Sequence, residues 1–374
     1  MSEIKQGYKQ TKVGIIPEDW EVVKLGKIAP LQRGYDLPTD SVQEGIYPVV
    51  YSNGILRFHN EYKAKAPGIV TGRSGTIGRV TYVEDNYWPH NTSLWVTNFY
   101  DNNPKFVYYM YINLDLTKFS AGSGVPTLNR NDVHIQDISL PPLKEQEKIA
   151  EILTTWDKSI TKQTELLRAK ELLKIALMQK LLSGEVRFDG FSDKWEEVKI
   201  KDIFEITRGY VLAVTEMSQE QTAEYKYPVY SSQTKNNGLT GYYKDYLFEN
   251  CITWTTDGAN AGDVNLRKGK FYCTNVCGVL KSDKGYANQC IAEILNLVTK
   301  NYVSYVGNPK LMNNTMGGIK IKIPKSLPEQ QKIAEVLSLA DDEINLLKNE
   351  LEELKLQKKA LMQKLLTGQV RVKV

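Results

Sequence analysis

The sequence of 374 residues lacks any apolar run long enough to cross a bilayer, and its first residues lack the apolar stretch of an export signal. Its apolar content of 41% and charged content of 25% are typical of soluble globular proteins. A chain of this length is too long for one ordinary core, so we expect at least two domains. These features predict a soluble, cytoplasmic protein.

Cysteine is scarce and its spacing is unsuited to metal. The four cysteines, Cys251, Cys273, Cys277 and Cys290, all lie in the second half of the chain. A zinc site usually takes CxxC-like pairs, which this spacing does not provide. A reducing compartment gives no reason for these thiols to form disulfides. We therefore interpret them as buried core residues and expect no metal site.

Catalytic motifs are missing as well. The sequence contains no Walker loop, no HExxH, no GxSxG and no GxGxxG. The nearest approach to the DPPY or NPPF tetrapeptide of amino-methyltransferases is Asn103, Pro104 and Lys105, which lacks the second proline and the aromatic residue. We therefore expect no catalytic residues and no bound cofactor, and we interpret the chain as a protein that is not an enzyme by itself.

The net charge of +4 says little about partners. Residues 18–143 carry 11 basic and 13 acidic side chains, and residues 190–327 carry 17 and 14. Nucleic-acid binding depends on the clustering of basic residues and not on such totals. The function has to be inferred from the organisation of the chain.

The chain contains a long internal repeat. The segment EQEKIAEILTTWDKSI from Glu145 returns as EQQKIAEVLSLADDEI from Glu329, 184 residues later. At the same offset and without a gap, ALMQKLLSGEVR from Ala176 returns as ALMQKLLTGQVR from Ala360. A period this long indicates a domain duplication, because solenoid repeats recur about every 20 to 50 residues.

A looser repeat precedes each of these segments. The residues around Trp20 resemble those around Trp195, and the triplet Arg33 to Tyr35 returns as Arg208 to Tyr210, 175 residues later. The order along the chain is therefore globular part, helix, globular part, helix.

The repeated segments predict two long helices with an apolar heptad stripe. In the second helix Lys358 is the only polar position of the stripe, whereas Gln163, Lys170 and Lys174 interrupt the stripe of the first. The apolar positions are Ile149, Leu153, Trp156, Ile160, Leu167, Leu177 and Leu181 in the first helix and Ile333, Leu337, Ala340, Ile344, Leu347, Leu351, Leu354, Leu361 and Leu365 in the second.

The predicted pairing follows from this stripe. Neither helix can bury such a stripe alone, so we expect the two to form an antiparallel coiled coil. The alternative is that each helix packs on its own domain. We predict that the second helix starts after Pro328 and stops at Gly368, where proline and glycine mark helix ends.

The globular parts show strand and turn signals. Short alternating or aromatic runs are broken by Gly, Asn and Pro, as in the segments that start at Ile69 and Cys251. A helix is expected from Pro104 and a half-buried strand at Ile319–Ile323. The fold class is therefore α+β, with two mainly β domains in a duplicated, pseudo-two-fold arrangement, separated by two long helices.

Polar residues in the loops are candidates for nucleic-acid contacts. Arginine can bind guanine, Asn and Gln can bind adenine, and Ser, Thr and Lys can bind phosphates. For each single residue, an ordinary role in a turn stays open as the alternative. The candidates are Arg33, Arg73, Ser74, Thr76, Arg79, Arg208, Ser231, Ser232, Gln233, Lys235 and Asn236.

In this order, the segments resemble the specificity subunit of type I restriction-modification systems. TKVGIIPEDWEVVKL from Thr11 resembles the usual opening of that family, GSGVPTLNRNDV from Gly122 its pre-helix loop, and PPLKEQEKIAEIL from Pro141 the start of its helix. ALMQKLLSGEVRF from Ala176 is similar to the helix ends of the family. The resemblance covers nearly the whole chain.

This resemblance implies a non-catalytic subunit that reads a split DNA target with one domain for each half-site. The recognition domains would be residues 18–143 and 190–327, with an N-terminal segment at 1–17, a central spacer helix at 144–189 and a C-terminal spacer helix and tail at 328–374. The helices would set the distance between the domains and dock two methyltransferase subunits, which bring S-adenosylmethionine. Restriction and translocase subunits would join later.

The resemblance gives no DNA contacts, because the base-reading loops vary most in this family. The second globular part departs from the first at its glycine loop, TTDGANAG against TGRSGTIG, and at LMNNTMGG against GSGVPTLN. This difference predicts a different half-site. Two other functions stay open, a coiled-coil adapter whose β domains bind protein, and a methyltransferase or nuclease with unfamiliar motifs.

Overall fold

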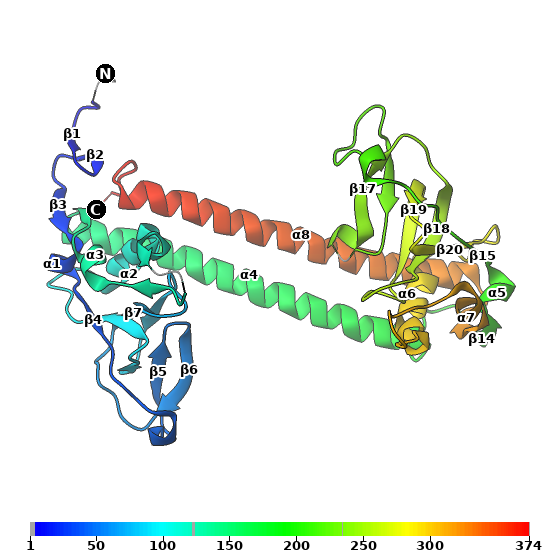
Figure 1. The fold of residues 1–374 in the computed structure, drawn as a ribbon, viewed down its shortest axis with the longest axis horizontal. Helices are drawn as coiled ribbons and strands as arrows, with labels where there is room; N and C mark the ends of the chain where they lie inside the picture. The colour runs from blue at the N-terminus through cyan, green and yellow to red at the C-terminus, as the bar shows by residue number, and fades with distance from the viewer. Residues whose placement is uncertain (1–3, 122–123, 234, 374) are drawn as a thin grey trace. The chain divides into compact units, whose positions relative to one another are not determined.

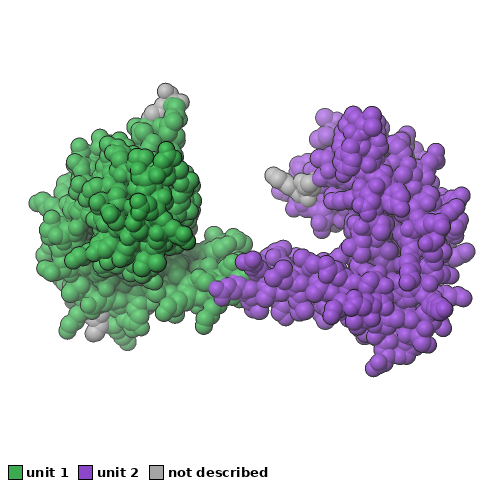
Figure 2. All heavy atoms as spheres, turned by 90° about the horizontal axis from the view of Figure 1, so that it is seen from below, with its two compact units in different colours: residues 1–164, 349–374 green, residues 165–348 purple. Residues whose placement is uncertain are grey.

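The structure is a computed structural model that describes residues 4–121, 124–233 and 235–373. The chain forms two compact units, unit 1 with residues 1–164 and 349–374 and unit 2 with residues 165–348 (Figure 2). Among the described residues, no helix combines the length and apolar character that a membrane span requires.

Unit 1 contains thirteen strands, three short α-helices and two 3-10 helices, Thr39–Ser41 and Leu116–Phe119, among its described residues (Figure 1). The strands are β1 (Tyr8–Thr11), β2 (Gly14–Pro17), β3 (Glu21–Lys24), β4 (Leu31–Arg33), β5 (Tyr47–Tyr51), β6 (Gly54–His59), β7 (Gly68–Gly72), β8 (Val80–Val83), β9 (Trp88–Pro89), β10 (Ser93–Val96), β11 (Ser120–Ala121), β12 (Thr127–Leu128) and β13 (Asp137–Leu140). The helices are α1 (Leu25–Ile28), α2 (Pro104–Leu114) and α3 (Arg130–His134).

Unit 2 contains eight strands, three short α-helices and three 3-10 helices, Val214–Glu216, Lys235–Gly238 and Thr299–Tyr302, among its described residues. The strands are β14 (Glu196–Lys199), β15 (Glu205–Arg208), β16 (Tyr227–Tyr230), β17 (Leu239–Tyr243), β18 (Phe248–Thr255), β19 (Val264–Cys273), β20 (Cys277–Lys281) and β21 (Lys320–Ile323). The helices are α5 (Ile200–Ile203), α6 (Gln289–Val298) and α7 (Asn313–Gly318).

The sheets of the two units have the same topology. Unit 1 has sheets of order β4-β10-β7-β8 and β6-β5-β9, and unit 2 has one sheet of order β15-β20-β18-β19-β16-β17. Strand β19 of unit 2 corresponds to positions 80–89 of unit 1, where β8 and β9 are two separate strands. The continuous strand β19 therefore joins into one sheet the strands that form two sheets in unit 1. The predicted duplication of mainly β domains with long helices is confirmed.

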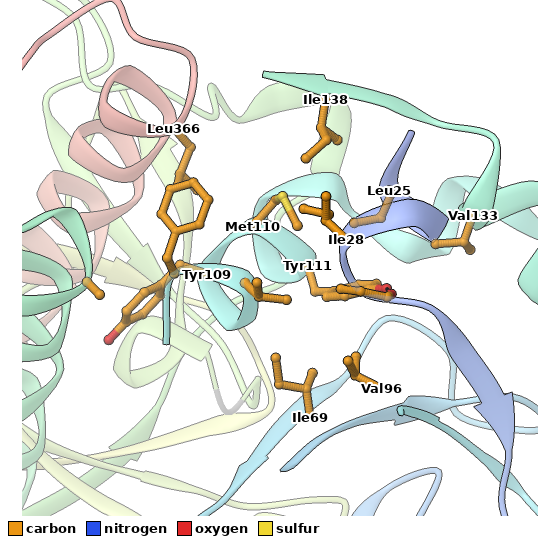
Figure 3. Packing of buried hydrophobic residues seen from close by; sticks show 14 of the residues in the cluster. Leu25, Ile28, Ile69, Val96, Tyr109, Met110, Tyr111, Val133, Ile138 and Leu366 are labelled. Atoms are coloured by element: carbon orange, nitrogen blue, oxygen red, sulfur yellow. Dashed lines mark hydrogen bonds between the residues drawn. The ribbon is translucent and has the colours of Figure 1, made fainter. Parts of the chain in front are cut away.

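The main hydrophobic core of unit 1 includes the buried face of α2 together with residues of the sheet and of the long helices. Helix α2 starts where the Asn103 side chain accepts a hydrogen bond from the amide of Phe106, with Pro104 in its first turn. Tyr109, Met110 and Tyr111 of this helix lie among the buried apolar residues of the unit (Figure 3). The helix predicted from Pro104 is confirmed, and it covers one face of β7 and β8.

The cysteines of unit 2 are buried, as the sequence predicts. Cys251, Cys273 and Cys277 pack in one apolar cluster, and Cys290 belongs to the larger core of the unit. Burial raises the pKa of Cys277 to about 11 and that of Cys290 to about 12. Strand β21 alternates buried isoleucines with exposed lysines, which confirms the predicted half-buried strand.

The two long helices are α4 (Leu143–Ser183) and α8 (Leu327–Leu366). The prediction that α8 begins after Pro328 is wrong, because the helix includes this proline in its first turn. Proline is tolerated there since the first amides of a helix have no partner inside it. Gly368 has a φ of 70°, which suits the residue after a helix end.

The ends of the apolar stripe pack into the cores of the units. Ile149, Leu153 and Leu365 belong to the core of unit 1, and Leu181, Ile333 and Leu337 to that of unit 2. Between these ends, Ile344, Leu347 and Leu351 are buried as well. The stripe therefore serves both predicted arrangements, domain packing at its ends and helix pairing along its middle.

Polar residues that interrupt the stripe meet polar partners on the other helix. In unit 1, Gln163 donates to Glu350 at 3.0 Å and Lys358 pairs with Asp157. In unit 2, Lys170 lies 2.6 Å from Glu343 and Lys174 lies 2.6 Å from Asp341. Within both units the partner numbers on α8 fall as those on α4 rise. The predicted antiparallel coiled coil is confirmed.

We expect Lys174→Asp to lower the free energy of unfolding by about 1 to 2 kcal/mol, because it removes an ion pair and places two carboxylates together. The double variant Lys174→Asp with Asp341→Lys should recover most of this loss, and urea unfolding measures both. A double variant no more stable than the single one would contradict the pairing.

Candidate nucleic-acid interface

The glycine loop of unit 1 is a tight connection between β7 and β8. Thr71 Oγ1 donates to the carbonyl of Arg79 at 2.9 Å and closes the base of the loop. A side chain at Gly72 would meet the carbonyl oxygen of Thr76 at 1.7 Å, so this position requires glycine. Gly75 and Gly78 have φ values of 85° and 95°, which other residues rarely adopt.

This loop pairs with the segment 126–128, which leads into α3. The backbone of Ser74 forms a bridge with Thr127, and Gly75 donates to the carbonyl of Pro126 at 2.9 Å. Leu128 donates to the carbonyl of Arg73 at 2.9 Å. Two segments in which the repeats differ thus form one composite surface, which we call the composite loop.

Unit 2 builds the same composite loop from different side chains. Asp257 forms the bridge with Lys310, and Gly258 donates to the carbonyl of Pro309 at 2.9 Å. The amide of Leu311 donates to the carbonyl of Thr256, as the amide of Leu128 donates to the carbonyl of Arg73 in unit 1. The backbone scaffold is therefore shared, whereas Arg73 and Ser74 are replaced by Thr256 and Asp257.

The structure brings some of the predicted site residues of unit 1 together. Arg33, at the end of β4, and Arg73 line the same cavity, and Ser74 lies beside them in the composite loop. Thr76 is exposed at the tip of the glycine loop. Arg79 is apart from this group, because its guanidinium lies against Gly54 at the start of β6.

The polar loop after β16 in unit 2 is held by its own hydrogen bonds. Ser231 accepts from the Thr274 hydroxyl at 3.0 Å, and the carbonyl of Ser232 accepts from Asn260 at 2.8 Å. The side chain of Gln233 donates to the carbonyl of Leu239. These contacts give the three residues a structural role in the turn, beside the predicted DNA contact, which stays a prediction.

The remaining predicted residues of unit 2 lie on the surface. Asn236 is exposed and has a φ of 51°, a left-handed conformation that asparagine tolerates better than most residues. Arg208 is exposed at the end of β15, in the place that Arg33 has in unit 1. The side chain of Lys235 lies outside the described part of the chain.

Arg267 is a residue that sequence reasoning missed. Its guanidinium carbon lies 3.7 Å from the centre of the Tyr230 ring, and its Nε donates to Thr253 Oγ1 at 3.0 Å. The side chain is 6% exposed, and burial lowers its pKa from the usual value. Arg267 lies close to Gly238, at the end of the polar loop, so this buried side chain packs against the loop. No motif in the sequence indicates such a role.

A buried carboxylate fastens the globular part of unit 1 to the long helices. Glu145, in the first turn of α4, is 1% exposed and accepts from Trp20 Nε1 at 2.9 Å. Arg371 donates to both of its carboxylate oxygens, at 3.0 and 2.7 Å, and to both of those of Asp19 at 2.8 Å. Hydrogen bonding to Arg371 lowers the pKa of Asp19.

The same arrangement recurs in unit 2. Glu329, in the first turn of α8, is 1% exposed and accepts two hydrogen bonds from Arg187, at 2.8 and 2.7 Å. The indole nitrogen of Trp195 lies 3.4 Å from the same carboxylate. We call these two arrangements the Glu-Arg-Trp clamps. The repeat predicts that their residues are equivalent, but not that they meet.

A buried glutamine follows each clamp. Gln146 accepts from the amide of Asn103 at 3.0 Å, and Gln330 accepts from the side chain of Asn288 at 2.8 Å. Since Asn103 and Asn288 cap α2 and α6, each glutamine ties the start of a long helix to the helix that covers the sheet. Among the described residues, no group of three His, Cys, Asp or Glu side chains could hold a metal ion.

Comparison with known proteins shows the family of this duplicated chain. The sequence model of the type I restriction modification DNA specificity domain matches residues 17–169 and residues 192–356. The chain belongs to this family. It is a type I specificity subunit with two target recognition domains.

Individual relatives agree with this assignment. A putative type I specificity subunit of Mycoplasma pneumoniae, S.MpnORF201P, is 34% identical over 204 residues, which are 54% of this chain and 81% of that protein. The putative type I restriction enzyme MjaX specificity subunit of Methanocaldococcus jannaschii is 25% identical and covers 99% of this chain and 98% of its own. The type I S subunit of M. genitalium shares the fold, with a TM-score of 0.69 at 19% identity, over 93% of this chain and 96% of its own.

We expect Arg371→Ala to destabilise unit 1 of the specificity subunit by about 3 kcal/mol, because it leaves a buried carboxylate without its countercharge. Arg187→Ala should have the same effect on unit 2, and Arg371→Lys a smaller one, since lysine cannot bind both oxygens in a fork. Urea unfolding measures these losses. Arg168→Ala, at an exposed position of α4, is the control and should stay within about 0.5 kcal/mol of the parent. Equal stabilities of the Arg371 and Arg168 variants would contradict the role of the clamp.

Proposed function

We propose that this chain is the DNA-reading subunit of a type I restriction-modification enzyme and binds a bipartite duplex target. Residues 18–143 and 190–327 would be the two recognition domains, each for one half-site. The observation that carries this proposal is the composite loop, which has one backbone scaffold and two sets of side chains. A shared scaffold with exchanged polar residues suits the reading of two different base sequences.

The long helices, with residues 144–189 and 328–374, would fix the distance between the half-sites and dock two methyltransferase subunits. Apolar side chains on α4 support the docking role, because Leu166, Leu172, Leu173 and Ile175 are between 43% and 58% exposed. S-adenosylmethionine would be bound by the methyltransferase subunits, and restriction and translocase subunits would complete the enzyme. The chain itself would need no cofactor and no catalytic residue.

Binding measurements test this proposal against the two other functions. The chain with its methyltransferase partner should bind a bipartite duplex with an affinity that falls steeply as salt rises, because phosphate contacts release counterions. An adapter for proteins would bind no duplex. Methyl transfer by the isolated chain would favour the enzyme instead.

Exchanging residues 18–143 for the matching domain of a relative should change one half of the methylated sequence and leave the other half intact. The reason is that each composite loop is built within its own unit. Sequencing of methylated bases in a genome that carries the chimaera and its methyltransferase checks this. Changes in both halves would contradict one domain for each half-site.

Inserting four residues into α4 at about Leu166 should lengthen the spacer of the methylated sequence by nearly two base pairs. One helical turn adds about 6 Å, and base pairs are stacked about 3.4 Å apart. The half-site sequences should stay the same, because no composite loop is altered. The measurement is the spacer length in the methylated motif, and an unchanged spacer in an active variant would show that the helices do not set it.

Two further variants sharpen this experiment. A matched four-residue insertion in α8 after Lys348 retains the ion pairs of each unit, because both insertions lie at the boundary between the units. An insertion of two residues should reduce methylation more than one of four, because it rotates the apolar stripe by about 200° away from the other helix.

A further inference from the structure

Three arginines converge on one cavity of unit 1. The cavity has a volume of about 460 Å³ and is lined by Arg33 from β4, Arg73 from the composite loop and Arg130 from the start of α3. Leu94 and the segment 127–129 complete its wall. Arg130 lies 57 residues after Arg73 in the sequence, so only the pairing of the two loops brings them together.

The cluster carries an excess of positive charge. Arg33 lies 3.2 Å from Asp36, and the same carboxylate oxygen accepts from Asn91. Arg73 donates to the backbone carbonyl of Asn91 at 3.4 Å. Among the described residues, neither Arg73 nor Arg130 makes an ion pair, and the carboxylate of Asp36 pairs with Arg33 alone. Such a site attracts groups that offer only acceptors.

The fold does not require these arginines. Unit 2 has the same backbone pairing at the equivalent place, where Arg208, Thr256 and Asn313 stand for Arg33, Arg73 and Arg130. Two of the three positive charges are therefore absent from a scaffold that forms equally well. A ligand explains the charges in unit 1, whereas the demands of folding do not.

We propose that Arg33, Arg73 and Arg130 form a subsite of unit 1 that binds an acceptor-rich group of DNA, and that unit 2 lacks this subsite. The group is either the O6 and N7 edge of a guanine or a backbone phosphate in the first half-site, because both offer acceptors in the fork geometry of arginine. This inference rests on the proposed function and adds the chemistry of one half-site to it. The guanidinium of Arg33 is oriented by Asp36, which leaves its other donors for the ligand.

The test replaces arginines of unit 1 by the residues of unit 2, in the chain assembled with its methyltransferase partner. Arg73→Thr and Arg130→Asn should each weaken binding to the native bipartite duplex by roughly 5- to 150-fold, as expected for the loss of one specific arginine contact. Arg57→Asn is the matched control, because it removes an exposed positive charge of β6 in the same unit. Thermal unfolding should show equal stabilities, since unit 2 accepts threonine and asparagine at these positions.

Two readouts distinguish the two DNA groups. Loss of a phosphate contact should weaken binding to all duplexes alike and reduce the slope of log affinity against log salt by about one. Loss of a guanine contact should relax the methylated sequence at one base of the first half-site and leave the second half-site unchanged. Either result supports the subsite.

The inference is overturned if Arg73→Thr and Arg130→Asn bind and methylate like the parent, or lose no more affinity than Arg57→Asn. The parent complex separates this failure from that of the proposed function. A parent that binds the bipartite duplex while the variants are unaffected overturns the subsite alone. A parent without salt-dependent duplex binding overturns the proposed function itself.

Discussion

The buried carboxylate at the start of each long helix is the interaction on which the architecture depends. Glu145 and Glu329 are withdrawn from water, which is costly unless the charge is matched closely. Each is matched by the fork of an arginine that follows the end of the other long helix, Arg371 or Arg187, and by an indole donor. Each buried carboxylate therefore binds three parts of its unit: the start of one long helix, the segment after the end of the other, and the tryptophan that precedes β3 or β14.

Two kinds of information specify the coiled coil. The apolar stripe provides the driving force for burial, but leucines repeated at heptad spacing pack equally well in several registers. The polar interruptions remove this ambiguity, because Lys174 and Lys170 in unit 2 and Gln163 in unit 1 each have a partner on α8 at one register only. The polar residues that interrupt the apolar stripe of α4 thus select the register in which α8 pairs with it.

The duplication separates stability from specificity. The backbone pairing of the composite loop, two glycines with positive φ in its glycine loop and the clamps are common to both units. The side chains that project from this scaffold differ, with Arg73 and Arg130 in unit 1 against Thr256 and Asn313 in unit 2. Because the scaffold does not depend on these side chains, they are free to differ with the DNA half-site that we propose for each unit.

The sequence by itself determined the duplication, the family, both long helices, the helix from Pro104 and the burial of the cysteines. These features depend on local periodicity and on similarity along the chain, which a single sequence displays. Only the tertiary structure decided that Arg130 joins Arg33 and Arg73, that Arg267 supports a loop, and that Arg371 reaches Glu145. Such contacts join residues that are far apart in the chain, and their energies arise from burial and geometry that no local pattern records.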